Sequence, residues 1–147
     1  MTTKTTTLNH LFDADMTVRS QEVKDAVTSP EGKVGKYMGG GDGEVTGQIN
    51  GKMYWDLYED MDGDVCLTNF AGKIETEDGA TIRFDARGHG KVVNPERPND
   101  WVMVYGVKFE TGDEHYNWLN ATLGVWEGEF SMETYKHNYR IYANRYD

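Results

Sequence analysis

Short turn signals between alternating segments constrain the fold of this chain more than any other feature. Asn50-Gly51, Asp62-Gly63 and Asp78-Gly79 each separate two segments in which apolar and polar residues alternate. Such pairs favour two-residue hairpins, because the type I′ turn needs positive φ at both central residues. Alternation with a period of two is the pattern of a half-buried strand. The middle of the chain is therefore predicted to be an up-and-down antiparallel meander.

Alternation continues toward both ends of the chain. From Leu8 to Arg19, one face carries His10, Phe12 and other apolar residues, while the opposite face is mostly polar or acidic. Residues 33–38, 101–111, 118–130 and 132–143 are predicted as further strands. A sharp turn is expected at Gly39–Gly43, because glycine adopts positive φ at little cost. Residues 20–32 are expected to form a short helix or a long loop.

Eight or nine strands in one chain must protect their edges, and closure into a barrel removes edges altogether. A barrel of about eight strands has an interior that side chains fill or that holds one small ligand. The length of 147 residues fits one domain. We therefore predict an all-β fold over residues 8–147: a single antiparallel up-and-down β-barrel with a central cavity, lipocalin-like or allene-oxide-cyclase-like. Residues 1–7 are predicted to be a disordered polar tail.

Composition excludes several classes of partner. The chain carries 15 basic and 25 acidic residues, a formal charge of −10, and its basic residues are scattered. Phosphate binding needs clustered Lys and Arg, so nucleic acid and anionic membranes are not expected partners. No apolar run approaches the roughly 20 residues of a bilayer span. With a single cysteine, Cys66, and no signal-peptide pattern, the chain is predicted to be cytoplasmic.

Familiar metal, phosphate and nucleophile motifs are not matched. Asp60–Asp64 resembles the start of a calcium loop, but Val65 and Ala71 stand where that loop needs Gly and Glu. No histidine pair has zinc-site spacing. The glycine run at Gly39–Gly43 lacks the Lys-Ser/Thr of a phosphate loop, and no Gly-x-Ser-x-Gly elbow occurs. We expect no metal and no cofactor.

One family shares several segments with this chain. The most specific block is Phe109-Glu110-Thr111-Gly112-Asp113 followed by Tyr116-Asn117-Trp118-Leu119-Asn120. Two shared segments lie upstream of it, residues 74–80 and residues 86–88, and the second contains Arg87. Further upstream, Trp55 follows a glycine-rich stretch. Over about Leu8 to Tyr142 the chain resembles the DUF3237 family, also called UPF0311. Many members have Gly-Ala-Asp before the Trp, where this chain has Lys52-Met53-Tyr54.

The resemblance implies a small antiparallel barrel with a central cavity. It does not imply any particular activity. By analogy of fold, it points to barrels that hold hydrophobic ligands or run cofactor-free isomerisations, eliminations and cyclisations. It also turns three residues that match the family pattern, Arg87, Glu110 and Trp118, into candidates for a functional site. The segment with Trp118 includes Asn120, which we group with the binding candidates.

Our first hypothesis is a cofactor-free isomerase, lyase or cyclase for a small apolar carbonyl, lactone or phenolic compound. Glu110 would be the general base, with a pKa raised by burial, and Arg87 or Tyr105 would stabilise the developing oxyanion. The residues expected to bind the substrate are Trp55, Trp118, Trp126, His10 and Asn120.

Structural roles compete with these assignments. The favoured alternative for His10 is a core histidine satisfied by one hydrogen bond, and for Tyr105 it is a packed ring. If Ile82 and Phe84 face the core, Arg87 and its charged neighbours on that strand are solvated.

Two other functions remain open. The cavity would bind a small apolar or aromatic ligand without chemistry, through apolar walls and a few polar groups. A filled barrel would instead act through its surface, for example as a homodimer whose interface holds the surplus Trp and Tyr.

The first hypothesis is tested by Glu110→Gln. We expect ligand affinity to be kept and turnover to fall by at least about 100-fold, the usual range for acid–base catalysis. An unchanged rate would remove Glu110 from the mechanism.

Overall fold

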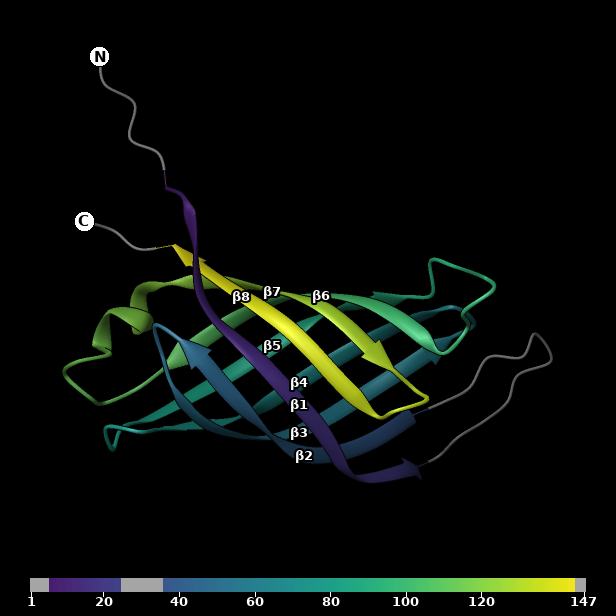
Figure 1. Cartoon of the computed structure of the whole chain (residues 1–147), viewed down its shortest axis with the longest axis horizontal. Helices are drawn as coiled ribbons and strands as arrows, with labels where there is room; N and C mark the ends of the chain where they lie inside the picture. Colours follow the sequence, from purple (N-terminus) through teal and green to yellow (C-terminus); the bar gives the residue numbers. More distant parts are fainter. Residues whose placement is uncertain (1–5, 25–35, 145–147) are drawn as a thin grey trace, which may run out of the picture.

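Eight antiparallel strands close into a barrel in which every strand pairs with its neighbours in the chain and β1 pairs with β8 (Figure 1). This computed structural model describes residues 6–24 and 36–144. The predicted all-β barrel is thus confirmed. The elements are β1 (Leu8–Lys24), β2 (Lys36–Gly47), β3 (Gly51–Asp62), β4 (Val65–Thr76), β5 (Thr81–Lys91), β6 (Asp100–Glu110), the 3-10 helix η1 (Asn117–Ala121), β7 (Leu123–Ser131) and β8 (Lys136–Asn144).

Three predicted boundaries are wrong. Residues 20–24 continue β1, and the rest of the predicted helix or loop, residues 25–32, lies outside the described residues, as do residues 1–5 of the predicted tail. Gly39–Gly43 form no turn but lie inside β2, paired with β3. The strand predicted over residues 118–130 begins only at Leu123, because η1 occupies the preceding residues.

The glycines of β2 let neighbouring groups approach its backbone closely. A Cβ atom at Gly41 would lie 1.9 Å from the Thr17 carbonyl oxygen and 2.7 Å from Cζ2 of Trp55. The Trp55 indole occupies this space, and its Nε1 donates a hydrogen bond to the Asp42 carbonyl oxygen at 3.1 Å. Glycine is needed here for lack of a side chain rather than for a turn.

Alternation decides which side chains face inward. Trp101, Met103, Tyr105, Val107 and Phe109 are all buried, as their period predicts. On β5, Ile82 and Phe84 are buried, whereas Arg83, Asp85 and Arg87 are exposed.

His10 breaks the predicted alternation of β1. A bulge between His10 and Phe12 inserts Leu11 into the ladder, and Leu11 and Phe12 are both buried. An inserted residue reverses the faces before it, so His10 lies on the outer surface instead of with Phe12.

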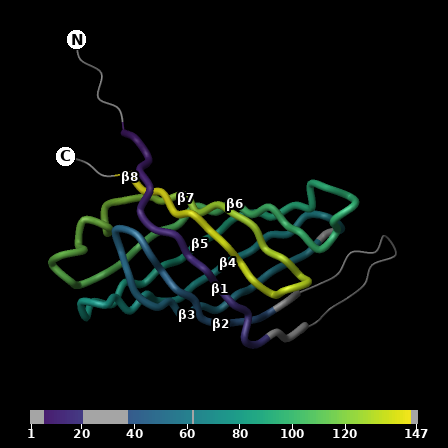
Figure 2. The backbone as a smooth tube through the Cα atoms, in the orientation of Figure 1, coloured from purple at the N-terminus to yellow at the C-terminus, as the bar shows by residue number. Residues whose placement is uncertain are grey.

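The two ends of the barrel differ (Figure 2). At the plugged end, where β1 begins and β8 ends, η1 places the fully buried Leu119 in the core. The Tyr116 hydroxyl donates to Asp78 Oδ2 at 2.7 Å and joins the loop before η1 to the β4–β5 turn. The rim end carries the β3–β4 turn, the β5–β6 connection and the β7–β8 turn. Its rim side chains are apolar and only partly buried: Val18, Met61, Val92, Phe130 and Met132.

Replacing Gly41 tests the packing of β2. We expect Gly41→Ala to lower the free energy of unfolding by about 2–3 kcal/mol, because the new Cβ meets a backbone oxygen that cannot turn away. Urea unfolding measures the change. Gly106→Ala is the matched control, since a Cβ there meets no atom within 4 Å, and its effect should stay within about 0.5 kcal/mol. Equal effects of the two substitutions would contradict this account.

Candidate functional site

Six polar or ionisable side chains face inward toward the rim end and the middle of the barrel, and we call them the inner polar cluster. They come from four strands: Glu59 from β3, Cys66 and Thr68 from β4, Tyr105 from β6, and His137 and Tyr139 from β8. All six are buried. Burial of so many titratable groups in one small interior is costly, and such sites are where functional residues concentrate.

Glu59 is the carboxyl of the inner polar cluster. It pairs with Thr68 across β3 and β4, and the Thr68 hydroxyl donates to Glu59 Oε2 at 2.9 Å. Only 7% of Glu59 is exposed. Burial raises its pKa above 4.5, and the Thr68 hydrogen bond opposes that rise in part. A carboxylate whose pKa is raised is a stronger base, which suits it to take a proton from a substrate.

A chain of hydrogen bonds joins the other side of the cluster. The Tyr139 hydroxyl lies 2.6 Å from Nδ1 of His137 and 3.5 Å from the Tyr105 hydroxyl. Burial lowers the pKa of His137 to about 3, so its ring is neutral at pH 7. When Tyr139 donates to Nδ1, the ring proton sits on Nε2. That Nε2 is buried and has no hydrogen-bond partner among the described residues.

The carboxyl and the tyrosines act on one another electrostatically. Burial raises the pKa of both Tyr105 and Tyr139 well above 10, and the negative charge of Glu59 raises them further. Glu59 therefore lies within electrostatic reach of both phenols. Since these phenols stay protonated, they are donors to any negative charge that forms beside them.

Aromatic rings surround this polar group. The ring of Phe130 stacks on His137 with a centroid distance of 4.0 Å, and the rings of Trp55 and Phe70 meet His137 edge-on at 5.6 and 5.3 Å. Rings of this kind exclude water and lower the local dielectric, which strengthens every charge interaction inside. Cys66 is chemically quiet in this setting, because burial raises the pKa of its thiol to about 12.

Three of the predicted site residues lie in this interior. Tyr105 belongs to the inner polar cluster, and Trp126 meets it edge-on at 6.3 Å. Trp55 packs on His137 as described above.

Two predicted catalytic residues lie outside, and the structure does not bring them together. Arg87 is on the outer face of β5, with 76% of its side chain exposed, and it pairs with Asp85 at 3.6 Å. Glu110 is exposed at the end of β6, where its backbone neighbour is Arg83 rather than Arg87. Arg87 and Glu110 are therefore not neighbours, because Arg83, which pairs with Glu110, lies four positions before Arg87 on β5.

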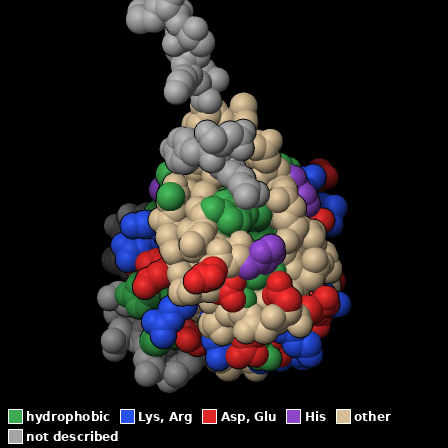
Figure 3. Space-filling model, turned by 90° about the vertical axis from the view of Figure 1, so that its left-hand side faces the viewer, with side chains coloured by type: hydrophobic (Ala, Val, Ile, Leu, Met, Phe, Trp, Pro, Cys, Tyr) green, Lys and Arg blue, Asp and Glu red, His purple; other side chains and the backbone are tan. Residues whose placement is uncertain are grey.

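The remaining predicted binding residues lie near the plugged end. Asn120 holds the loop before η1, accepting from the Thr111 N–H at 2.8 Å and donating to the Thr111 carbonyl at 2.9 Å. Trp118 is partly buried in η1. His10 is exposed and bonded to Asp13 at 2.7 Å. Viewed onto this end, several acidic side chains lie below a central apolar patch (Figure 3).

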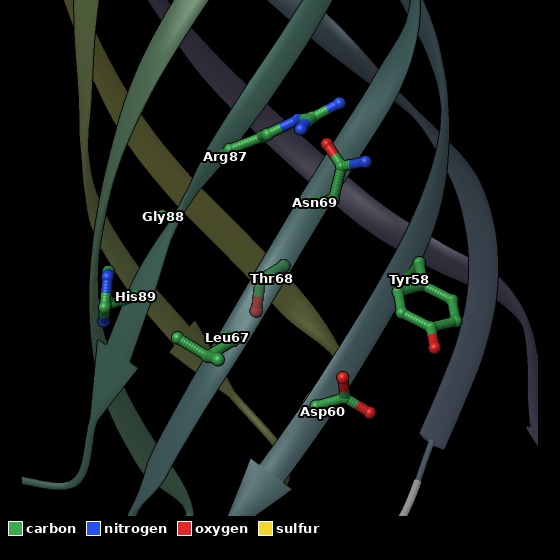
Figure 4. Close-up of a pocket in the computed structure, with 8 residues that line it drawn as sticks. All are labelled: Tyr58, Asp60, Leu67, Thr68, Asn69, Arg87, Gly88 and His89. Atoms are coloured by element: carbon green, nitrogen blue, oxygen red, sulfur yellow. The ribbon is translucent and has the colours of Figure 1, made fainter.

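Two outer grooves hold the exposed candidates. A groove of about 460 Å³ crosses β3, β4 and β5, and Tyr58, Asn69 and Arg87 line it from three adjacent strands (Figure 4). A second, of about 540 Å³, contains Glu110 and Asn120. Both are open to solvent and lack the buried titratable groups of the interior.

Sequence reasoning missed Glu59, Thr68 and His137. The signal was present in the sequence. At a period of two, Glu59 shares a strand face with Leu57 and Met61, and His137 shares one with Tyr139 and Ile141. A charged or polar residue at an inward position of an apolar strand marks such a site. Among residues 6–24 and 36–144, no three His, Cys, Asp or Glu side chains are placed to hold a metal ion. No helix in those ranges is long and apolar enough to cross a membrane.

Comparison with known proteins places the chain in a family. Residues 6–144 match the family described as a protein of unknown function, DUF3237. The chain belongs to the DUF3237 family. No curated protein matches its sequence.

Several solved structures share the fold. A protein of unknown function from Clostridium acetobutylicum has a TM-score of 0.80 at 18% identity, covering 97% of this chain and 99% of its own. A beta-barrel like protein from Acinetobacter baumannii has a TM-score of 0.78 at 16% identity, covering 98% and 99%. A structure described as an enzyme from Penicillium herquei has a TM-score of 0.64 at 18% identity, covering 96% and 98%.

Burial of neutral His137 makes stability depend on pH. Below pH 6.5 the unfolded chain binds a proton that folded His137 refuses until about pH 3, so stability falls as pH falls through this window. We expect His137→Phe to reduce the slope of unfolding free energy against pH there by about 1.4 kcal/mol per unit. Urea unfolding between pH 4 and 7 measures it. A wild-type slope in His137→Phe would contradict burial of the neutral ring.

Proposed function

We propose that this DUF3237 protein is a cofactor-free acid–base enzyme that acts on a small apolar carbonyl or phenolic compound at the inner polar cluster. The observation that carries the proposal is the buried Glu59, whose pKa is raised, facing the same interior as neutral His137 with its unpartnered Nε2. The reaction class is proton transfer next to a carbonyl, leading to isomerisation, elimination or ring closure.

The residues divide the work of such a reaction. Glu59 takes a proton from the carbon beside the carbonyl, and Thr68 holds the carboxylate by its 2.9 Å hydrogen bond. Negative charge then develops on the substrate oxygen, where the His137 Nε2–H donates to it. Tyr139 and Tyr105 support the imidazole through Nδ1. Donors already oriented toward the developing charge are the largest source of rate in many enzymes.

A substrate would reach the inner polar cluster from the rim end of the barrel. Met61 lies one inward position from Glu59 on β3, and Phe130 stacks on His137. The interior around them is closely packed, so a substrate must displace rim side chains to reach the cluster. Methionine adapts readily to such a change because its side chain is unbranched and flexible.

The Penicillium herquei neighbour supports catalysis in this fold, since it is described as an enzyme. At 18% identity the likeness concerns the barrel and carries no substrate or residue role to this chain. The chemistry proposed here is therefore argued from the interior residues alone.

Hydrogen–deuterium exchange tests the proposal without a known substrate. Small ketones and lactones are incubated with the protein in D₂O, and loss of the α-proton signal is followed by ¹H NMR. We expect exchange above the buffer rate for a coherent group of compounds, and Glu59→Gln to lower it at least about 100-fold. Glu110→Gln is the matched control, because it makes the same substitution at an exposed carboxylate, and it should exchange at nearly the wild-type rate.

Other outcomes would assign a different function. Compounds that raise the melting temperature but exchange at the buffer rate would indicate a binding barrel. A rate lost in Glu110→Gln and kept in Glu59→Gln would return the site to the outer groove. No thermal shift across the panel would favour a filled barrel that acts through its surface.

A further inference from the structure

Buried hydrogen-bond donors without partners occur in the part of the interior that the structure describes. Four buried side-chain atoms in the described residues lack partners, and three of them belong to inward-facing rings: Trp101 Nε1, Trp126 Nε1 and His137 Nε2. The fourth, Asn69 Oδ1, lines the outer groove. Buried polar groups are bonded in the great majority of cases, so such exceptions need an explanation.

Two of these donors lie at one level of the barrel. Trp101 pairs with Phe130 across β6 and β7, and Phe130 pairs with His137 across β7 and β8. All three are therefore neighbours in one row across the inner wall at the rim end. Phe130 lies between the two donors and stacks on the His137 ring at 4.0 Å.

Trp55 shows that a buried indole in this barrel can have a hydrogen-bond partner. Its Nε1 donates to the Asp42 carbonyl in the same barrel. Trp101 has no such acceptor, although it is only 4% exposed. A buried N–H without a partner costs free energy, and an acceptor brought by a ligand recovers it.

Charge selects the kind of acceptor. The His137 ring is neutral and the indole carries no charge, so neither donor supplies the positive charge that would offset the cost of burying an anionic ligand. Glu59 faces the same interior and repels a second carboxylate. The surrounding rings, Phe130, Trp55 and Phe70, offer flat apolar contacts that suit an aromatic group.

We propose that the interior site takes a neutral aryl ketone, whose carbonyl oxygen accepts from Trp101 Nε1 and His137 Nε2 and whose ring packs beside Phe130. This substrate class rests on the proposed function and deepens it. With the oxygen held by these donors, the carbon beside the carbonyl is the one presented to Glu59.

Matched ketones and hydrocarbons test the donor pair. The probes are acetophenone, 1-indanone and 1-tetralone, each compared with ethylbenzene, indane or tetralin, and dissociation constants come from tryptophan-fluorescence titration. We expect at least one ketone to bind about tenfold or more tightly than its hydrocarbon, as two modest hydrogen bonds allow. Equal binding of every pair, or no binding of any ketone up to its solubility, would overturn the proposal.

Single substitutions assign the preference to the two donors. Trp101→Phe and His137→Phe each keep an aromatic ring but remove an N–H, and each should cut the ketone preference by about threefold or more. Trp118→Phe is the control, because it makes the same indole-to-phenyl change in η1 at the plugged end, away from the proposed site, and it should leave the ratio unchanged. A preference kept in both donor variants would overturn the proposal.

A direct reading covers the case in which a donor variant fails to fold. The carbonyl stretch of 1-indanone bound to wild-type protein should lie below its frequency in cyclohexane, because hydrogen bonds weaken the C=O bond. An unshifted band would overturn the proposal.

Glu59→Gln separates this proposal from the catalytic one. It should keep the ketone preference while losing deuterium exchange. A ketone preference without exchange in wild-type protein would leave the donor pair in place and defeat the catalytic proposal. Exchange without the preference would do the reverse.

Discussion

Closure of the sheet by the β1–β8 ladder is the interaction on which the rest of this structure depends. It satisfies the backbone groups of both edges and turns one face of every strand into a shared interior. Once closed, a barrel of this size has room for its own inward side chains and at most one small ligand. Each inward residue therefore has to fit its neighbours, as the close approach of Trp55 to the backbone at Gly41 shows.

The same closure explains the chemistry of the inner polar cluster. Groups that would be unremarkable in water are moved into a dry interior, where Glu59 holds its proton more tightly and His137 loses its own. The hydrogen bonds from Thr68 and Tyr139 offset only part of that cost. Apolar residues at these positions would give a more stable barrel. The buried polar groups, and the unpartnered donors beside them, therefore suggest a role in function rather than in stability.

Much of the barrel was predictable because its signals are local. The Asp-Gly and Asn-Gly turns and the period of two place most strands, and they put Tyr105, Trp55 and Trp126 inside. The predictions of strand faces and turns were wrong where a single inserted residue changes the pairing register of a strand, or where a contact with a distant residue decides the backbone conformation. The inserted Leu11 moves His10 outward, and the contact with Trp55 keeps the glycine run extended within β2.

The functional residues show the same division. Glu110 and Arg87 were chosen from a matched pattern along the chain, but their strands place them on the outer surface in separate grooves. The sequence by itself determined the strands, their order and the aromatic content of the interior, since turns and alternation act over a few residues. Only the tertiary structure brought Glu59, Thr68, Tyr105 and His137 into one interior, because burial and pKa depend on which strands close around a side chain.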